Sequence, residues 1–306
     1  MIRTKTFLRE LIRKICLLFL LLLLFGTNGW AQDLRAEISQ IIQSVKADVG
    51  VAIKHMENGD TLTFSGRRPF PMQSVFKFPL AIAVLNQVDK GKLSLQQKVS
   101  IAMDDFIPNT WSPIAEKYPK GGVELTIREL LSYTVSQSDN NGCDILFGLV
   151  GGPARVQEYF HGLGLKRIAI VNTEAEMHQS WNVQFNNFSE PWEMVKLLEA
   201  FHREKLLSKS SQHILIDMML KTITGRKRLK GMLPEGTDVA HRTGMSSTND
   251  QGVRAALNDV GVVTLPNGGH FAIAVFVSNT KEDTSKLEEL IAKISKATFD
   301  HYLSKQ

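Results

Sequence analysis

Residues 72–79 read MQSVFKFP and open an apolar stretch that continues to Leu85. Within them Ser74 and Lys77 are three positions apart, so on a helix both side chains lie on one face. In buried surroundings the Lys77 amine can accept the proton of the Ser74 hydroxyl, which makes that hydroxyl a nucleophile. Pro79 removes one backbone donor near the first turn of this predicted helix.

The Ser-x-x-Lys pattern is weak evidence alone, because Ser278 and Lys281 have the same spacing. There a predicted strand runs out into a polar turn. Ser74 has a different setting, since Met72, Phe76 and Phe78 surround it with apolar side chains. This context favours Ser74 as the reactive serine.

The two ends of the chain predict a sheet. Five stretches have the residue pattern of strands: 49–56, 61–64, 239–243, 260–265 and 271–278. Asn58-Gly59 and the Pro-Asn-Gly-Gly turn at 266–269 are typical of hairpins. Apolar residues recur at helical spacing after Asp33, the predicted N-cap, and again over residues 287–294.

The part between these ends reads as helices and irregular loops. Because parallel βαβ alternation is absent, we predict an α+β fold, in which an antiparallel five-stranded sheet is flanked by the N- and C-terminal helices. Residues 32–70 and 222–306 would form this α/β sandwich lobe, and residues 71–221 an inserted all-α lobe. A functional cleft is expected between the lobes.

Residues 1–31 are predicted to be a secretory signal peptide. They hold five basic residues and one acidic residue, so the net charge of +5 falls to +1 for the rest, and no basic patch indicates nucleic acid. The apolar run at 15–25 and the Gly-Trp-Ala ending predict cleavage after Ala31, and therefore a periplasmic protein. A retained membrane anchor is the alternative, but a spanning helix needs about 20 apolar residues. Cys16 lies at the start of the apolar run instead of after it, so it is in the wrong place to be a lipidated residue at the cleavage site.

Cys143 is then the single cysteine of the mature chain. An exported chain with one thiol has no internal disulfide, so its stability must come from its core. A cysteine nucleophile is one interpretation of Cys143. A buried helix residue is the interpretation we favour.

Two further motifs carry chemical groups. Ser138 and Asn140 belong to a Ser-Asp-Asn tripeptide, which supplies a hydroxyl for proton relay and an amide for a substrate carbonyl, or else a plain helix N-cap. Arg242, Thr243 and Gly244 lie on a predicted strand, where they offer a cation, a hydroxyl and close backbone approach. Decoration of an edge strand is the alternative for this second motif.

The three motifs in this order resemble those of the penicillin-recognising serine enzymes, namely Ser-x-x-Lys, Ser-Asp-Asn and Lys-Thr-Gly. The resemblance covers nearly all of residues 33–306 and implies the serine β-lactamase/penicillin-binding-protein transpeptidase fold. Arg242 departs from it, because most members have lysine there. Arginine keeps the positive charge and adds a planar fork, but the two cations are not equivalent.

An acid in the loop after the second motif separates the hydrolases of this family from the transpeptidases. Glu174 stands where class A β-lactamases carry that acid, with His178 in place of their usual asparagine four residues on; Glu176 is the competing choice. The PER/VEB-type extended-spectrum enzymes are similar here and at three further segments: residues 72–79, 110–113 and 228–231.

The resemblance implies a class A serine β-lactamase acting on penicillins and cephalosporins through a Ser74 acyl-enzyme. The proton of Ser74 would pass to Lys77, or through a water to Glu174. Glu174 would then activate the deacylating water, and Ser138 would return a proton to the leaving nitrogen.

The remaining roles also follow from the resemblance alone. The backbone N–H groups of Ser74 and Met245 would form the oxyanion hole. Six residues would contact the substrate: Trp111, Asn140, Arg228, Arg242, Thr243 and Gly244.

Other chemistries have little support in the sequence. The histidines show neither His-x-His nor His-Glu-x-x-His spacing, so no metal site or other cofactor is expected. A Gly-x-Ser-x-Gly elbow and a phosphate-binding loop are also missing. A monomer is expected. Two alternatives stay open: a D-Ala-D-Ala carboxypeptidase of the same fold, and a non-hydrolysing β-lactam sensor domain, which would need a transducing membrane span.

Overall fold

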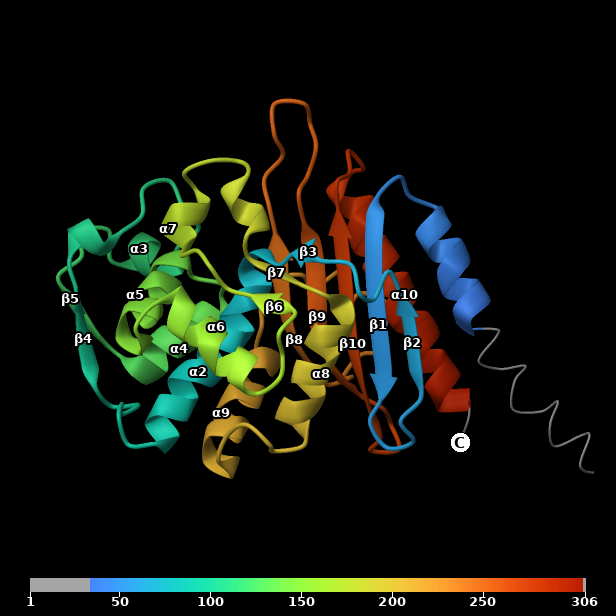
Figure 1. Ribbon diagram of the computed structural model, residues 1–306, viewed down its shortest axis with the longest axis horizontal. Helices are drawn as coiled ribbons and strands as arrows, with labels where there is room; N and C mark the ends of the chain where they lie inside the picture. Colours follow the sequence, from blue (N-terminus) through green and yellow to red (C-terminus); the bar gives the residue numbers. More distant parts are fainter. Residues whose placement is uncertain (1–33, 305–306) are drawn as a thin grey trace, which may run out of the picture.

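The computed structural model describes residues 34–304, so the signal peptide and the Asp33 cap lie outside the described residues. The fold is α+β, as predicted (Figure 1). Its main sheet is antiparallel with the order β2-β1-β10-β9-β8, which brings the two ends of the chain together. The five strands are β1 (Asp48–His55), β2 (Thr61–Phe64), β8 (Val239–Met245), β9 (Leu257–Thr264) and β10 (His270–Ser278).

Both predicted hairpins are confirmed. β1 pairs with β2 and β9 with β10, in each case antiparallel. Gly59 has a φ of +79° and Gly268 a φ of +84°, so each tight turn uses the positive φ that glycine adopts without strain. β8 pairs with β9 and lies at one edge of the sheet, and β2 lies at the other.

The two faces of the sheet are covered by different helices. A helix over residues 34–43 and α10 (Thr284–Ser304) pack on one face, where Ile38 and Ile291 meet the alternate strand residues Val51 and Val275. On the other face Ala274 lies in the same core as the helices of the middle of the chain. The period-2 alternation of buried residues therefore makes this sheet the middle layer of a sandwich.

Helices dominate the middle of the chain. They are α2 (Lys77–Asp89), α3 (Pro113–Lys117), α4 (Ile127–Ser136), α5 (Asn140–Val150), α6 (Pro153–Gly162), α7 (Glu174–Met177), α8 (Pro191–His202) and α9 (Lys209–Leu220), with three 3₁₀ turns, η1 (Gln73–Phe76), η2 (Met103–Asp105) and η3 (Val183–Phe185). The predicted apolar helix is α2, whose residues 77–85 are all buried. Pro79 is its third residue, where a missing N–H costs no intrahelical bond.

The structure also has short strands in the middle of the chain, which were not identified from the sequence. Five short strands lie there: β3 (Phe70–Pro71), β4 (Lys98–Ile101), β5 (Val123–Thr126), β6 (Ile168–Ala169) and β7 (Phe188–Ser189). β3, β7 and β6 form one small sheet, and β4 and β5 another. β3, β6 and β7 have two residues each, which is too few for an alternating pattern to mark them. β4 and β5 are as long as β2, but they are far apart in the sequence and no hairpin turn joins them, unlike β1 and β2.

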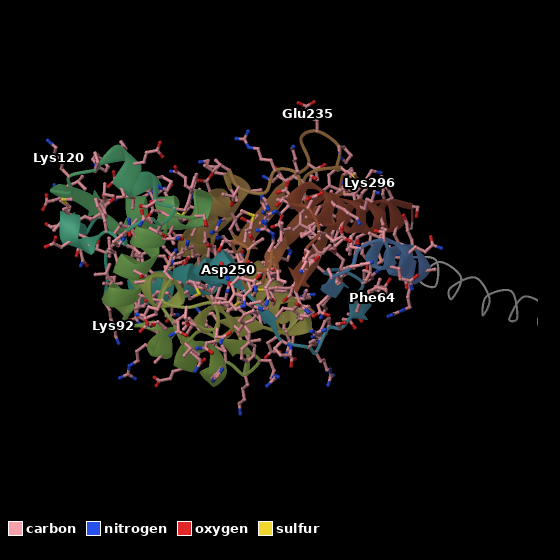
Figure 2. The ribbon with its side chains drawn as sticks, turned by 90° about the horizontal axis from the view of Figure 1, so that it is seen from above. Phe64, Lys92, Lys120, Glu235, Asp250 and Lys296 are labelled. Carbon is pink, nitrogen blue, oxygen red and sulfur yellow. The ribbon has the colours of Figure 1, made fainter. Side chains whose placement is uncertain are left out.

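Seen from above, the molecule is elongated (Figure 2). Lys92 and Lys120 lie at its helical end, Phe64 and Lys296 lie toward the opposite end, and Asp250 lies between them. We keep the division into two lobes, residues 32–70 with 222–306 against 71–221, as a proposal. Within residues 34–304 there is no helix of the length and apolarity needed to cross a membrane.

Candidate active site

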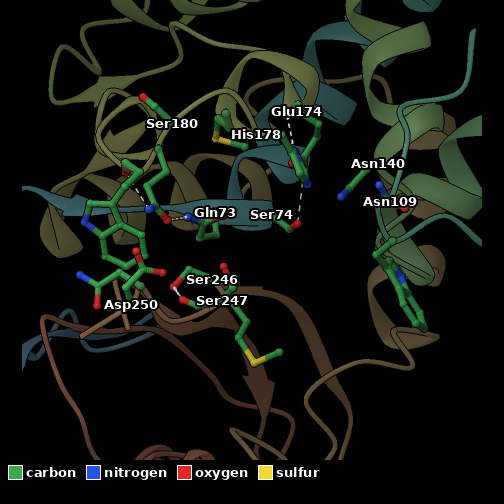
Figure 3. A pocket seen from close by; sticks show the side chains of 16 residues that line it. Gln73, Ser74, Asn109, Asn140, Glu174, His178, Ser180, Ser246, Ser247 and Asp250 are labelled. Carbon is green, nitrogen blue, oxygen red and sulfur yellow. Dashed lines mark hydrogen bonds between the residues drawn. The ribbon is translucent and has the colours of Figure 1, made fainter. Parts of the chain in front are cut away.

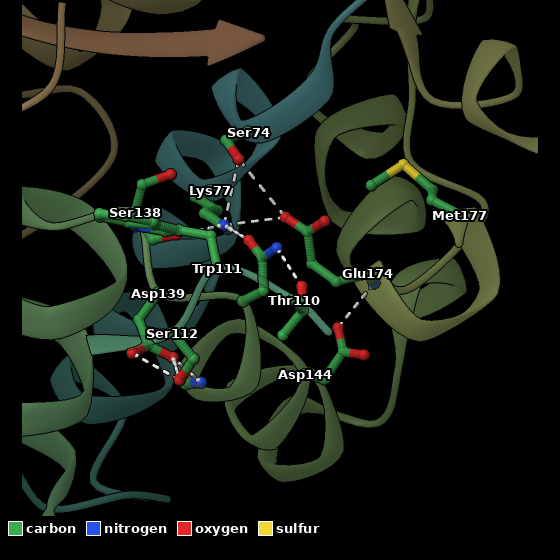
Figure 4. A network of polar contacts seen from close by, with 12 residues as sticks. Ser74, Lys77, Thr110, Trp111, Ser112, Ser138, Asp139, Asp144, Glu174 and Met177 are labelled. Carbon is green, nitrogen blue, oxygen red and sulfur yellow. Dashed lines mark hydrogen bonds and ion pairs between the residues drawn. The ribbon is translucent and has the colours of Figure 1, made fainter. Parts of the chain in front are cut away.

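Ser74 and Lys77 meet at the start of α2 (Figure 4). Ser74 lies in η1 and Lys77 is the first residue of α2, so the Lys77 amine reaches the Ser74 hydroxyl at 3.1 Å. Lys77 is fully buried, and it also donates to the Ser138 carbonyl oxygen at 2.9 Å and to the Asn140 side-chain oxygen. The first two sequence motifs thus converge on the side-chain nitrogen of Lys77.

Glu174 completes this cluster from α7. Its Oε1 lies 2.8 Å from Lys77 Nζ and 3.5 Å from Ser74 Oγ, and the residue is 3% exposed. A buried carboxylate between a lysine and a serine hydroxyl is placed to move protons at that hydroxyl.

Glu176 has a different task. It closes a capping box with Thr173, accepting from the Thr173 N–H at 2.9 Å while Thr173 Oγ1 accepts from the Glu176 N–H. Asn172 donates to the same carboxylate. These contacts explain the short α7 helix, and they support Glu174 rather than Glu176 as the acid that faces Ser74.

Asp144 holds this helix in place and was not among the residues singled out from the sequence. Its two carboxylate oxygens accept from the backbone N–H groups of Glu174 and Ala175 at 2.7 and 2.9 Å. Burial, with the nearby charge of Glu174, raises the pKa of Asp144 to about 6. Asp144 follows Asn140 by four residues on α5, so helical spacing was the one signal available for it.

The raised pKa of Asp144 predicts a pH effect on stability. The folded protein binds this proton more tightly than the unfolded chain, so the carboxyl lowers the free energy of unfolding as pH rises from 3.8 to about 6. The loss amounts to about 3 kcal/mol. In urea unfolding between about pH 4 and pH 7, Asp144→Asn should lack this loss, and equal pH slopes in the two proteins would contradict the assignment.

The Ser-Asp-Asn tripeptide serves as both cap and site. Asp139 is the N-cap of α5, accepting from the Gly142 N–H, so the plain N-cap interpretation holds for this residue. Ser138, with a φ of +63°, and Asn140 at the first position of α5 turn instead toward Lys77.

Arg242 lies beneath the site. It is fully buried, and it donates to the Ser74 carbonyl oxygen at 3.0 Å, to the Val135 carbonyl oxygen at 3.2 Å and to the Ser138 hydroxyl. Burial lowers its pKa to about 10, against the opposing effect of Glu174. The Arg242 guanidinium therefore contacts the site by its hydrogen bond to the Ser138 hydroxyl.

The rest of β8 lies against the nucleophile. A Cβ on Gly244 would stand 2.3 Å from the Met72 carbonyl oxygen and 3.3 Å from the Ser74 nitrogen, so only glycine permits this approach. Thr243 hydrogen-bonds Thr224 at 2.6 Å. Met245 follows at the exposed end of the strand. The third motif is thus beside the first, as the cleft hypothesis expected.

Two cavities open on Ser74. One, of about 390 Å³, is lined by Ser138, Thr243, Gly244 and Arg228, among others. The Arg228 guanidinium already donates hydrogen bonds within the protein, to the Gly244 and Asn258 carbonyl oxygens and to the Glu288 carboxylate.

The other cavity, of about 600 Å³, extends from Ser74 past Glu174 and is shown in Figure 3. Gln184 and Asp250 are among the residues that line it. Trp111 lines both cavities; it is 56% exposed, and its indole N–H is fixed on the Gln137 carbonyl oxygen at 2.8 Å.

His178 contacts the backbone of Glu174 and the side chain of Thr110. Its Nδ1 donates to the Glu174 carbonyl oxygen at 2.7 Å, and its Nε2 lies 3.4 Å from Thr110 Oγ1. Thr110 in turn accepts from the Asn140 amide at 2.6 Å. From the sequence, His178 stood out only as a departure from the class A pattern, and Thr110 only as part of a segment similar to the PER/VEB-type enzymes.

Cys143 is buried in α5, as favoured from the sequence. Burial raises the pKa of its thiol well above the ordinary value, which leaves it protonated and unreactive at neutral pH.

The geometry defines a serine acyl-transfer site, with a hydroxyl nucleophile, a buried lysine and carboxylate beside it, and glycine-lined backbone at the cavity edge. Residues 33–302 match the model of the β-lactamase enzyme family. The chain is 45% identical to β-lactamase VEB-1 of Pseudomonas aeruginosa, over 94% of this chain and 98% of that protein. It is 40% identical to the extended-spectrum β-lactamase PER-1 of the same organism, over 92% and 91%.

Solved structures agree with these relatives. A β-lactamase from Chitinophaga pinensis superposes with a TM-score of 0.86 at 53% identity, covering 88% of this chain and 99% of that one. The TLA-1 extended-spectrum β-lactamase gives 0.87 at 48%, covering 89% and 99%. The chain belongs to the β-lactamase enzyme family, in class A, and is a β-lactam hydrolase. The family, fold and enzyme predictions are confirmed.

Proposed function

We propose that this enzyme opens the β-lactam amide of penicillins and cephalosporins through an acyl-enzyme on Ser74, and that Glu174 activates the water that releases it. The observation that carries the proposal is the buried contact of Lys77 with both Ser74 and Glu174, at 3.1 and 2.8 Å, on the floor of an open cavity. No step in this scheme requires a metal or a cofactor.

In acylation, Ser74 Oγ attacks the strained carbonyl carbon and its proton leaves for Lys77 directly or for Glu174 through a water. Both bases are in range of the hydroxyl. The N–H groups of Ser74 and Met245 receive the oxyanion, and the close approach of Gly244 to Ser74 supports this pairing. The C–N bond then breaks, and the Ser138 hydroxyl relays the proton that Ser74 lost to the leaving nitrogen, giving its own proton and taking that one in exchange.

Substrate binding is proposed to divide among residues that line the cavities. Trp111 forms the aromatic wall, Asn140 holds the substrate's side-chain amide, and Thr243 and Arg228 hold its carboxylate beside Gly244. Arg242 lies behind this lining, so its charge acts on the same carboxylate and on Ser138 from below.

In deacylation, Glu174 takes a proton from a water as that water attacks the acyl carbonyl. The C–O bond to Ser74 then breaks, and the proton passes from Glu174 back to the Ser74 oxygen. Asp144 and His178 hold the backbone of Glu174, so they position this base without touching the substrate.

An extended substrate range is proposed from two observations. PER-1 and TLA-1 are extended-spectrum enzymes by name. The larger cavity continues beyond Ser74 to residues 180–184 and 246–250, which offers room for the bulky side chains of later cephalosporins. We also propose a monomer that acts in the periplasm, after a signal peptide over residues 1–31 has been removed.

One experiment tests the function. Purified residues 32–306 are mixed with excess cephalosporin and followed by absorbance and by intact mass. Rapid ring opening with little remaining adduct is expected. A lasting adduct on Ser74 without turnover would instead make the chain a peptidase or a sensor, and no adduct would contradict the proposed mechanism.

A further inference from the structure

Glu57, His202 and His270 form a cluster that the hydrolytic mechanism does not use. One potential ligand atom from each lies within 4.8 Å of the others. The two imidazole rings have centroids 4.5 Å apart, and the Glu57 carboxylate meets His270 Nδ1 at 3.2 Å. None of the three residues lines either active-site cavity.

Three different elements hold this cluster. Glu57 follows β1, His270 begins β10, and His202 is the last residue of α8. The Met56 N–H donates to the His270 carbonyl oxygen and the His270 N–H donates to the Glu57 carboxylate, so the turn after β1 is tied to β10. α8 packs on both strands. The donor atoms therefore come from a preorganised framework.

The chemistry of these donors suits a divalent transition metal. Two imidazoles and one carboxylate are a common ligand set for Zn²⁺, whose bonds to such atoms are about 2.0–2.2 Å long. Binding requires the side chains to rotate until the three atoms reach that distance, and Glu57 and His270 are 47% and 27% exposed at the side chain. His202 also stands at a helix C-terminus, where carbonyl groups favour a cation.

The neighbouring side chains Arg203 and His55 have hydrogen-bond partners of their own, which leaves the donor atoms of the cluster accessible to a metal ion. Arg203 is engaged with Glu199 and with the Met56 carbonyl oxygen. His55 Nδ1 lies 3.4 Å from Glu57 and accepts from a backbone N–H. A cavity of about 170 Å³ beside His202 and His270 leaves room for a water as fourth ligand.

We propose that Glu57, His202 and His270 bind one Zn²⁺ ion, which joins the β1–β2 turn, α8 and β10. The ion is a structural clip rather than a part of catalysis. Bound only by the folded state, it stabilises the fold by mass action. A chain whose described part has one buried cysteine gains in this way a cross-link that no disulfide supplies.

The test uses purified residues 32–306, stripped with EDTA and dialysed at pH 7.5. Equilibrium dialysis against ZnCl₂ should give one Zn²⁺ per chain, and 100 μM ZnCl₂ should raise the Tm by about 5 °C if the dissociation constant is about 1 μM. Hydrolysis of a cephalosporin should be equal with and without EDTA.

Three variants locate the ion. Glu57→Gln and His270→Asn should each weaken Zn²⁺ binding about 100-fold and abolish the rise in Tm, while the Tm of the stripped protein stays within about 2 °C. His213→Asn, at an exposed histidine of α9, should bind as the parent does. Absence of binding at 100 μM, or equal affinity in all three variants, would overturn the site.

Discussion

Glu174→Gln is expected to trap the acyl-enzyme. The amide keeps the shape of the side chain but cannot take a proton from water, so deacylation should slow by about 10³-fold, within the range for loss of a general base. Acylation should remain detectable, because Lys77 still contacts Ser74 at 3.1 Å. Intact mass after mixing with a cephalosporin should show the adduct persisting for minutes.

Glu176→Gln is the matched control for this variant. Glutamine also closes a capping box, so the contacts with Thr173 survive and α7 keeps its place. Turnover should then stay within about threefold of the parent. Unchanged turnover in Glu174→Gln, or an equal loss in both variants, would contradict the assignment of Glu174.

Ser74→Ala is expected to abolish the covalent step. Without the hydroxyl, no acyl-enzyme forms, and turnover should fall by about 10⁴-fold or more, as in other serine hydrolases stripped of their nucleophile. The deleted group is small and partly buried, so the fold should be retained. Burst kinetics and intact mass measure the loss, since neither a burst nor an adduct should appear.

Ser278→Ala provides the control that the chain itself contains. Ser278 and Lys281 have the same spacing as Ser74 and Lys77, but Ser278 ends β10 and Lys281 is exposed. This second pair therefore lacks the buried amine that activates a hydroxyl. Turnover in Ser278→Ala should stay within about twofold of the parent. A large loss would contradict the proposal that the Ser-x-x-Lys motif is reactive only where its lysine is buried.

The charge balance of the site explains why an anionic substrate would enter. Lys77 and Arg242 are both fully buried, while Glu174 is the carboxylate in direct contact with Lys77. Among the described residues that line the cavity beside Ser138 and Thr243, Arg228 is charged and none is acidic, so the field there is positive. A substrate carboxylate is attracted to this field before any direct contact forms.

Local patterns determined much of the fold. The five strands of the main sheet follow from residue alternation and turn chemistry, and each begins or ends within three residues of its predicted limits. The helix that carries Lys77 follows from an apolar run, and the burial of Cys143 from its position in a predicted helix. These features depend on neighbours in the sequence, which is why composition and periodicity reveal them.

Tertiary structure alone decided how the motifs are used. Spacing to His178 favoured Glu174 but left Glu176 as a competing choice, whereas the fold turns Glu174 toward Lys77 and Glu176 into a helix cap. Three further contacts join segments that are far apart in the chain. They are those of Asp144 with the backbone of Glu174, of Arg242 with Ser138, and of His202 with His270. Such contacts have no local signature, because they exist only once the sheet and helices have packed and excluded water from these groups.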